Sequence, residues 1–187
     1  MVLSPFVRTA MKSSVSRKNR ERGSVAQFPL IIFSLFLMFT FPMINLGTTA
    51  LRHTLYLHCC RRAASVAATA YSFSVGTTDK PAACVSGPAT VTSMASKYPG
   101  ITVQSTDVKI VSIQIDTGVV TTYTSKLPAP ANTGKNLYFI ELTSTAAIDP
   151  MTTVQLPCFL NIPGLCTSWT SKVSLREFVE SPQGLDD

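Results

Sequence analysis

Cysteine and histidine are the residues of this chain that could do chemistry. Its 187 residues include five cysteines and two histidines, side chains that form disulfides, bind metal ions or serve as nucleophile and base. His53 and His58 are five residues apart, so on a helix they point about 140 degrees away from each other and do not easily share one ion. No CxxC or HxxxH spacing occurs. We therefore expect neither a metal nor a cofactor.

A catalytic interpretation has no better support. His58 and Cys59 are adjacent in sequence, but adjacency on a helix is weak evidence for a nucleophile and its base. Glu141, Glu177 and Glu180 fall on strand positions that are typical of a solvated face. The chain also lacks a glycine-rich phosphate loop. We expect that the protein is not an enzyme.

Disulfide formation is the chemistry that the cysteines favour. Cys158 and Cys166 flank a short loop with a proline and a glycine, and we expect them to pair if this part of the chain lies in an oxidising compartment. Cys84 could reach Cys59 or Cys60 across another loop, which would leave an odd thiol. Cys59 and Cys60 could also be small buried residues without a bond.

A long apolar segment near the amino terminus is the main element of the chain. No charged side chain occurs from Phe28 to Leu46, about 19 residues, and a helix needs roughly 17 to 25 to cross a hydrocarbon core of about 30 Å. Pro29 falls in the first turn, where a missing N–H costs nothing, whereas Pro42 should kink the helix. Membrane helices tolerate such a proline. We predict one membrane span.

A cleaved secretory signal is the alternative interpretation of this segment. A basic region followed by an apolar core describes both a signal and a retained span. The apolar run is longer than the roughly 7 to 15 residues of a signal core, and no small-x-small cleavage site follows it directly. These two observations favour the retained span.

Six basic residues precede the span, with one acid among them. They are Arg8, Lys12, Arg17, Lys18, Arg20 and Arg22, against Glu21. A basic segment beside a span predicts that residues 1–23 are a cytoplasmic leader and that the carboxy-terminal domain lies on the far side of the membrane. Nucleic-acid binding is the alternative for such a cluster. No interleaved aromatic residues support it, so we expect no nucleic-acid partner.

A second helical pattern follows the span. From Arg52 to Phe73, alanine and apolar residues recur at steps of three and four, which is the spacing of an amphipathic helix. Only Gly47 interrupts the pattern between Leu46 and Tyr71. We predict one transmembrane and amphipathic helix over residues 24–73, on the order of 70 Å long. Its second half should pack against an outer domain.

Residues 74–187 are predicted to form a small extracytoplasmic α+β domain. A loop and a weaker helix come first, and then the hydrophobic period changes to two, which indicates strands. We expect three or four antiparallel strands packed on the long helix. The predicted elements are the loop Val75–Pro81, a helix Ala82–Tyr98 made doubtful by Gly87-Pro88, a strand from Ile101 to Ile115, a turn at Asp116–Gly118, and strands Val119–Thr124, Asn136–Ala146 and Ser168–Val179.

Taken together, these features resemble the TadE/TadG-like pseudopilins. The shared order is an Arg-Gly pair, a short stretch of small residues, a phenylalanine, the span, a Leu-Gly pair and an alanine-rich helix with paired arginines. In this chain the motifs stand as Arg22-Gly23, Phe28, Leu46-Gly47 and Arg61-Arg62. The resemblance covers Arg20 to Ala70. Beyond it only the plan is similar, with paired strands, a proline-rich connection and a closing strand that ends in Arg176-Glu177.

The resemblance implies a pilin-like fold and a minor subunit of a tight-adherence or Flp-type pilus, or of a related secretion apparatus, in the inner (plasma) membrane. Its partners would be other pilin-like subunits and a prepilin peptidase that cuts after Gly23, so that Ser24 becomes the new amino terminus. The family usually has glutamate at the fifth mature position, followed by phenylalanine. This chain has Gln27 at the fourth and Phe28 at the fifth, and Gln27 has no negative charge to pair with a neighbour's amino terminus.

A membrane-anchored extracytoplasmic binding module with no role in a filament is the alternative function. Serine and threonine are abundant from Thr117 to Ser125. The loop closed by Cys158 and Cys166 could present Phe159, Leu160 and Ile162, and loops on a rigid scaffold often carry binding. The same loop could simply cap the core.

Overall fold

The computed structural model describes the backbone of residues 13–152 and 162–187, and the side chains from residue 27 onward within these ranges. The chain divides into two compact units, Met1–Ile44 and Asn45–Asp187. The second unit holds the end of the long helix, a second helix and a four-stranded sheet. This arrangement confirms the predicted α+β class. The predicted division by role, at residues 23 and 73, stays a prediction.

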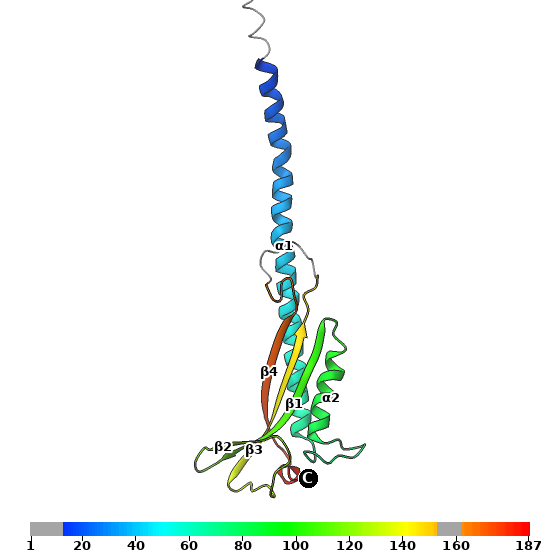
Figure 1. The fold of residues 1–187 in the computed structure, drawn as a ribbon, viewed down its shortest axis with the longest axis vertical. Coiled ribbons are helices and arrows are strands. Elements are labelled where there is room, and N and C mark those ends of the chain that lie inside the picture. Colours follow the sequence, from blue (N-terminus) through cyan, green and yellow to red (C-terminus); the bar gives the residue numbers. More distant parts are fainter. Residues whose placement is uncertain (1–12, 153–161) are drawn as a thin grey trace, which may run out of the picture. The chain divides into compact units, whose positions relative to one another are not determined.

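The long predicted helix is present as α1, Ser13–Ala68 (Figure 1). It continues through Pro29 and Pro42. It begins earlier than residue 24, so that part of the predicted leader is helical, and it ends before the predicted Phe73. The reason for the earlier end lies outside the helix, because the amide of Phe73 donates to the carbonyl of Gly184 (3.0 Å) and Phe73 is buried.

The sheet has the order β2-β1-β3-β4, and all its neighbouring strands are antiparallel. The central pair is long, from Ile101–Ile148 at one end to Gln114–Asn136 at the other, with one bulge between Val103 and Ser105. The strands lie close to their predicted positions. They are β1 (Ile101–Gln114), β2 (Val120–Tyr123), β3 (Asn136–Ile148) and β4 (Trp169–Phe178).

One face of the sheet packs against α1 and forms the core with it. Every second residue of β3 is buried, which is the alternation expected of a strand with one covered face. Small side chains of α1 meet this face, so the helix backbone can lie close to the strands. The α1 residues in the core are Tyr56, Cys60, Ala63, Ala64, Ala67 and Ala68, and the sheet residues include Val108, Ile110, Ile140, Leu142, Ala146 and Ile148.

Helix α2 (Ala83–Ala95) contains the Gly87-Pro88 pair that made its first half doubtful. The helix is continuous there because Gly87 allows it to approach the core. A Cβ at this position would lie 3.1 Å from a methyl of Val108 and 3.4 Å from the Cβ of Ala67. No side chain caps α2, and its first amides instead donate to the carbonyls of Ser72 and Phe73.

The C-terminal segment, Val179–Leu185, closes the end of α1. It contains the short 3-10 helix η2 (Pro182–Gly184). The amide of Glu180 donates to the last helical carbonyl, that of Ala68 (3.3 Å), and the amide of Leu127 donates to Leu185 (2.8 Å). Leu185 is buried. The carbonyls that a helix end leaves unsatisfied therefore find a partner in this segment.

Candidate functional site

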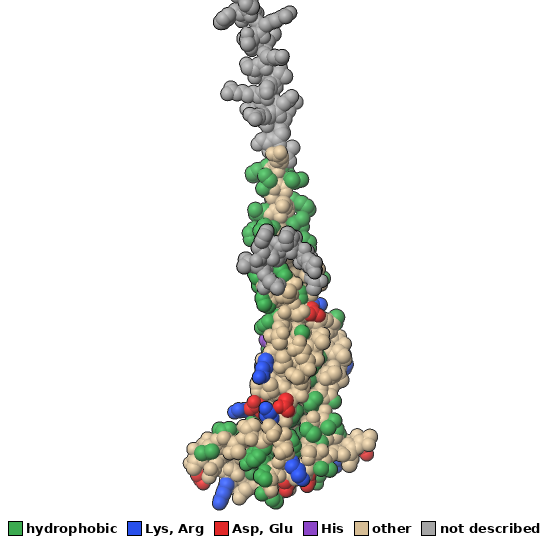
Figure 2. Space-filling model, in the orientation of Figure 1, with side chains coloured by type: hydrophobic (Ala, Val, Ile, Leu, Met, Phe, Trp, Pro, Cys, Tyr) green, Lys and Arg blue, Asp and Glu red, His purple; other side chains and the backbone are tan. Residues whose placement is uncertain are grey.

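The apolar side chains of α1 are exposed in the unit Met1–Ile44. Phe28, Leu30 and Met38 are 65%, 71% and 71% exposed, and Figure 2 shows hydrophobic side chains along this part of the helix. Such an apolar surface is too large and continuous to be typical of a protein in water. The stretch Gln27–Ala68 is the one helix of the described residues that is long and apolar enough to cross a membrane, with a mean hydropathy of 2.0 over its most apolar 18 residues. This finding suggests a single-pass membrane protein.

One polar group in the apolar stretch, the hydroxyl of Thr40, has its partner on the helix itself. The hydroxyl of Thr40 donates to the carbonyl of Phe36, four residues earlier (2.8 Å). This bond satisfies the hydroxyl without a partner from outside. The helix therefore presents an apolar surface at Thr40 as well.

The predicted processing residues all lie within α1. Gly23 and Ser24 are part of its helical backbone, and the side chains of Gln27 and Phe28 are exposed. Cleavage between Gly23 and Ser24 stays a prediction.

Asn45, where the second unit begins, binds two parts of the connection between β3 and β4. Its amide nitrogen donates to the carbonyls of Thr152 (3.1 Å) and Leu165 (3.0 Å), and its oxygen accepts from the amide (3.2 Å) and hydroxyl (3.0 Å) of Thr152. The side chain is only 5% exposed. Both hydrogens of the Asn45 amide nitrogen are therefore donated, and its oxygen accepts two hydrogen bonds, so this buried amide is fully satisfied.

Three more polar residues continue this face of α1. The hydroxyl of Thr49 donates to the carbonyl of Gly164 (2.9 Å), and the guanidinium of Arg52 donates to the carbonyl of Asp149 (2.5 Å). His53 Nε2 lies 3.0 Å from the hydroxyl of Ser171. Spacings of three and four place residues on one helix face, and we name Asn45, Thr49, Arg52 and His53 the polar row.

The polar row also brings the single tryptophan against the helix. The ring centroids of His53 and Trp169 are 4.8 Å apart, with the planes tilted by 37 degrees. Gly164 adopts a positive φ of 83 degrees, which favours glycine. A Cβ there would lie 3.4 Å from the methyl of Thr49 and 3.8 Å from the Cβ of Trp169. The loop thus packs closely between helix and strand.

Of the open alternatives for Cys59, Cys60 and Cys84, a disulfide from Cys84 to either neighbour is not present in this structure. Cys59, Cys60 and Cys84 carry no disulfide, and the first two are buried. The amide of Cys84 donates to Phe73, beyond the end of α1, whereas Cys60 lies about 12 Å back along the axis from Ala68. A disulfide needs Cα atoms within about 7 Å. The open alternative, small buried residues without a bond, describes Cys59 and Cys60.

The other predicted pair is not tested. Cys158 lies outside the described residues, as do Phe159 and Leu160 of the proposed binding loop. Ile162 is described, and it is 43% exposed. The bond between Cys158 and Cys166 stays a prediction.

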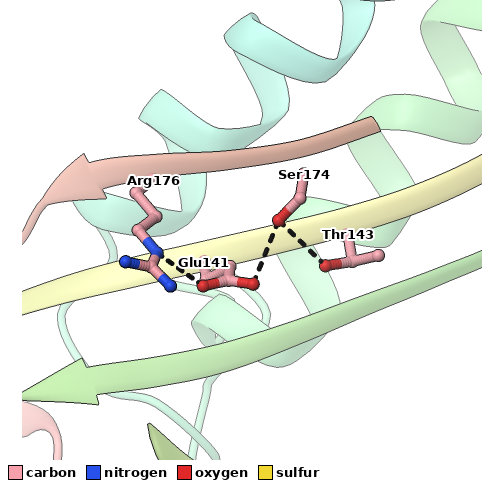
Figure 3. A network of polar contacts seen from close by, with 4 residues as sticks. All are labelled: Glu141, Thr143, Ser174 and Arg176. Atoms are coloured by element: carbon pink, nitrogen blue, oxygen red, sulfur yellow. Dashed lines mark hydrogen bonds and ion pairs between the residues drawn. The ribbon is translucent and has the colours of Figure 1, made fainter. Parts of the chain in front are cut away.

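The outer face of the sheet carries a polar network (Figure 3). Arg176 Nε lies 2.6 Å from a carboxylate oxygen of Glu141, and the hydroxyl of Ser174 donates to the other oxygen (3.0 Å). Thr143 in turn donates to Ser174 (3.3 Å). The Arg176 guanidinium holds the pKa of Glu141 below its usual range. This charged carboxylate therefore links β3 to β4 through Arg176 and Ser174.

Apolar side chains occupy the same outer face at the end of the sheet near β2. Opposite residues in an antiparallel pair share a face, so the register groups these residues together. The rings of Phe139 and Phe178 meet edge to face at 5.7 Å. Val120, Leu137 and Phe178 are 52%, 42% and 54% exposed. We name Ile113, Val120, Leu137, Phe139 and Phe178 the outer apolar patch.

The sequence did not point to the polar row. In the sequence, Asn45 is a polar residue near the end of the apolar run, and Arg52 begins the second helical pattern. The available signal was the run of Asn45, Thr48 and Thr49 where the apolar residues end. Polar residues at that position need hydrogen-bond partners, but the sequence alone does not show which distant residues supply them.

The two histidines lie in different surroundings. His53 contacts Ser171 and Trp169, whereas His58 is exposed. In the part of the chain that the structure describes, no three His, Cys, Asp or Glu side chains lie together so as to hold a metal ion.

No family model, curated protein or solved structure matches the chain.

Proposed function

We propose that this protein is a single-span envelope protein that acts as a TadE-like minor pilin or pseudopilin in pilus assembly or a related secretion apparatus. The observation that carries the proposal is α1. One helix supplies both an exposed apolar surface and the centre of an α+β domain. The motifs Arg22-Gly23 and Leu46-Gly47 support it at the sequence level.

The two parts of α1 would have different roles in this function. The residues from Phe28 to Ile44 contact lipid while the subunit is in the membrane, and helices of neighbouring subunits can replace lipid during assembly because both are apolar. The residues from Tyr56 to Ala68 stay in the core of their own domain. Gln27 offers an amide, so its contact with a neighbour's amino terminus would be a hydrogen bond rather than an ion pair.

Processing is tested by mass spectrometry of the membrane-extracted protein. We expect a new amino terminus at Ser24 in cells that contain a prepilin peptidase. Replacing Gly23 with a bulky residue should block the cut, whereas Gly47→Ala, a matched change farther along α1, should not. An intact amino terminus at Met1 in the unmodified protein would remove the processing step from the proposal.

Assembly is tested by photo-crosslinking. A benzoylphenylalanine at Phe33, which is 62% exposed in the apolar stretch, should give adducts with other subunits of the apparatus. The same reagent at Val85, 56% exposed on α2, is the control for random encounters. If the Phe33 position gives no more adducts than the Val85 position, the protein does not assemble through its apolar helix.

A membrane-anchored binding module is the second candidate, and the outer apolar patch favours it. Exposed apolar side chains beside a charged network are a common composition for a protein interface. Phe178→Ser with Leu137→Ser would test this function. Loss of partner capture with unchanged crosslinking at Phe33 would favour the binding module over the pilin-like subunit.

A further inference from the structure

The charge pattern of α1 extends beyond the apolar run. No Asp, Glu, Lys, Arg or His occurs from Ser24 to Leu51, about 28 residues or roughly 42 Å of helix. A bilayer is about 30 Å thick in its hydrocarbon core and about 40 to 45 Å with its headgroups. The uncharged length of the helix therefore matches the whole bilayer, and not only its core. Arg52 is the first charged residue after this length.

The polar row holds two parts of the β3–β4 connection at known heights along the helix. The loop residue Thr152 binds Asn45, and Gly164 binds Thr49. With Leu46 at the end of the hydrocarbon core, Thr49 lies about 5 Å and His53 about 10 Å farther along the axis. One headgroup layer is roughly 5 to 7 Å thick by the difference above. Gly164, which binds Thr49, therefore lies at the height of the headgroups, whereas Ser171, which contacts His53, lies just beyond them.

The residues at this height suit lipid headgroups and not water alone. Met151 and Ile162 are 61% and 43% exposed, and Leu51 on the helix is 62% exposed. Pro150–Thr152 and Ile162–Ser171 contain no charged side chain. Two charged residues beside these segments, Arg52 and Asp149, are joined by the hydrogen bond from the Arg52 guanidinium to the Asp149 carbonyl, and Arg52 lies about 9 Å beyond Leu46 along the axis, just past the headgroup layer.

Trp169 adds an independent observation. Tryptophan is enriched at membrane interfaces, where an apolar ring with one polar N–H is best accommodated. Trp169 is stacked on His53 and contacts the region of Gly164, which places it between the heights of Thr49 and His53. It is 38% exposed, so part of the ring is available to lipid.

We infer that residues 149–152 and 162–169 form a membrane-contacting surface that lies in the headgroup layer of a phospholipid bilayer, with Met151, Ile162 and Trp169 as the lipid contacts. The inference rests on the proposed membrane span. It goes beyond a plain anchor, because the outer domain itself then touches the bilayer.

Trp169 fluorescence tests this surface directly, since it is the only tryptophan in the chain. The full-length protein is reconstituted into phosphatidylcholine–phosphatidylglycerol vesicles that contain a nitroxide lipid, labelled either at the headgroup or at the end of an acyl chain. We expect the headgroup label to quench Trp169 about twofold more strongly than the chain-end label, as for an interfacial tryptophan. The double variant M151D/I162D should lose most of this quenching.

Two control proteins calibrate the depth, each in a Trp169→Phe background. Val119→Trp places the ring past the far end of β1, about 40 Å from Ile101, so neither label should quench it. Phe36→Trp places the ring in the middle of the apolar run, where the chain-end label should be the stronger quencher. These two positions define quenching in water and in the hydrocarbon core.

The outcomes separate the two proposals. If the chain-end label fails to quench Phe36→Trp, the proposed span is wrong. If it does quench Phe36→Trp while Trp169 behaves like Val119→Trp, the span stands and the membrane-contacting surface is refuted. Unchanged headgroup quenching in M151D/I162D would refute the role of these two side chains.

Discussion

Replacing Asn45 with alanine should release the loop that it holds. The side chain makes four hydrogen bonds, two donated to Thr152 and Leu165 and two accepted from Thr152. Each bond contributes about 0.5 to 1.5 kcal/mol net. Water can replace part of this at a loop near the surface. We expect the free energy of local opening to fall by about 2 to 3 kcal/mol, which is a roughly 30-fold to 140-fold increase in the opening constant.

Hydrogen exchange in the detergent-solubilised full chain measures this change. The amide of Thr152, which donates to Asn45, should exchange faster by that factor. The amide of Asp149 is the internal reference, since it donates to the carbonyl of Gly100 (2.9 Å) and does not involve Asn45. Thr40→Ala is the control variant, because its hydroxyl bonds only within the helix. If Thr152 exchanges at its original rate in Asn45→Ala, Asn45 does not hold the loop.

Three further substitutions test the stability of the domain. Gly184→Ala should lower the free energy of unfolding by about 1 to 3 kcal/mol, because its Cβ would overlap the backbone carbonyl of Tyr71. Gly47→Ala has open space around it and should raise that free energy by up to about 1 kcal/mol; similar denaturant midpoints for the two variants would contradict this reasoning. Glu141→Gln should destabilise by about 0.5 to 1 kcal/mol at neutral pH. Because Arg176 lowers the native pKa of Glu141, this stabilisation is present above the unfolded-state pKa of about 4.3 and is lost as the pH falls through the lower native pKa. Thermal melts from neutral to acid pH would show the difference between the unmodified protein and the Glu141→Gln variant vanish in acid, and a difference that does not vary with pH would count against the ion pair.

The strands could be predicted because their signal is local. In β3 the residues from Tyr138 to Ile148 alternate between the core and the outer face, and a period of two is visible in the sequence itself. The turn before β2 was also predicted, and Gly118 there has a φ of 69 degrees. The buried face of α1 followed from steps of three and four.

The end of α1 and the polar row could not be predicted, because distant residues decide them. The helical pattern continues to Phe73, and the helix stops at Ala68 where Glu180 and Gly184 supply backbone partners. Asn45 binds residues 107 and 120 positions away. From the sequence alone, Asn45 is an isolated polar residue near the end of an apolar run. Nothing local tells which loops will meet it.

The return of the C-terminal segment to the end of α1 has a consequence for folding. Glu180 and Gly184 must find Ala68 and Phe73, about 110 positions earlier in the chain, and contacts of such long sequence separation form slowly. Before these contacts form, the face of α1 that packs on the sheet in the folded domain is uncovered. That face consists largely of alanines such as Ala63, Ala64 and Ala67, which expose little apolar area. The alanine-rich face of α1 therefore lets the strands pack closely in the folded domain and also limits aggregation of the helix before the sheet covers it.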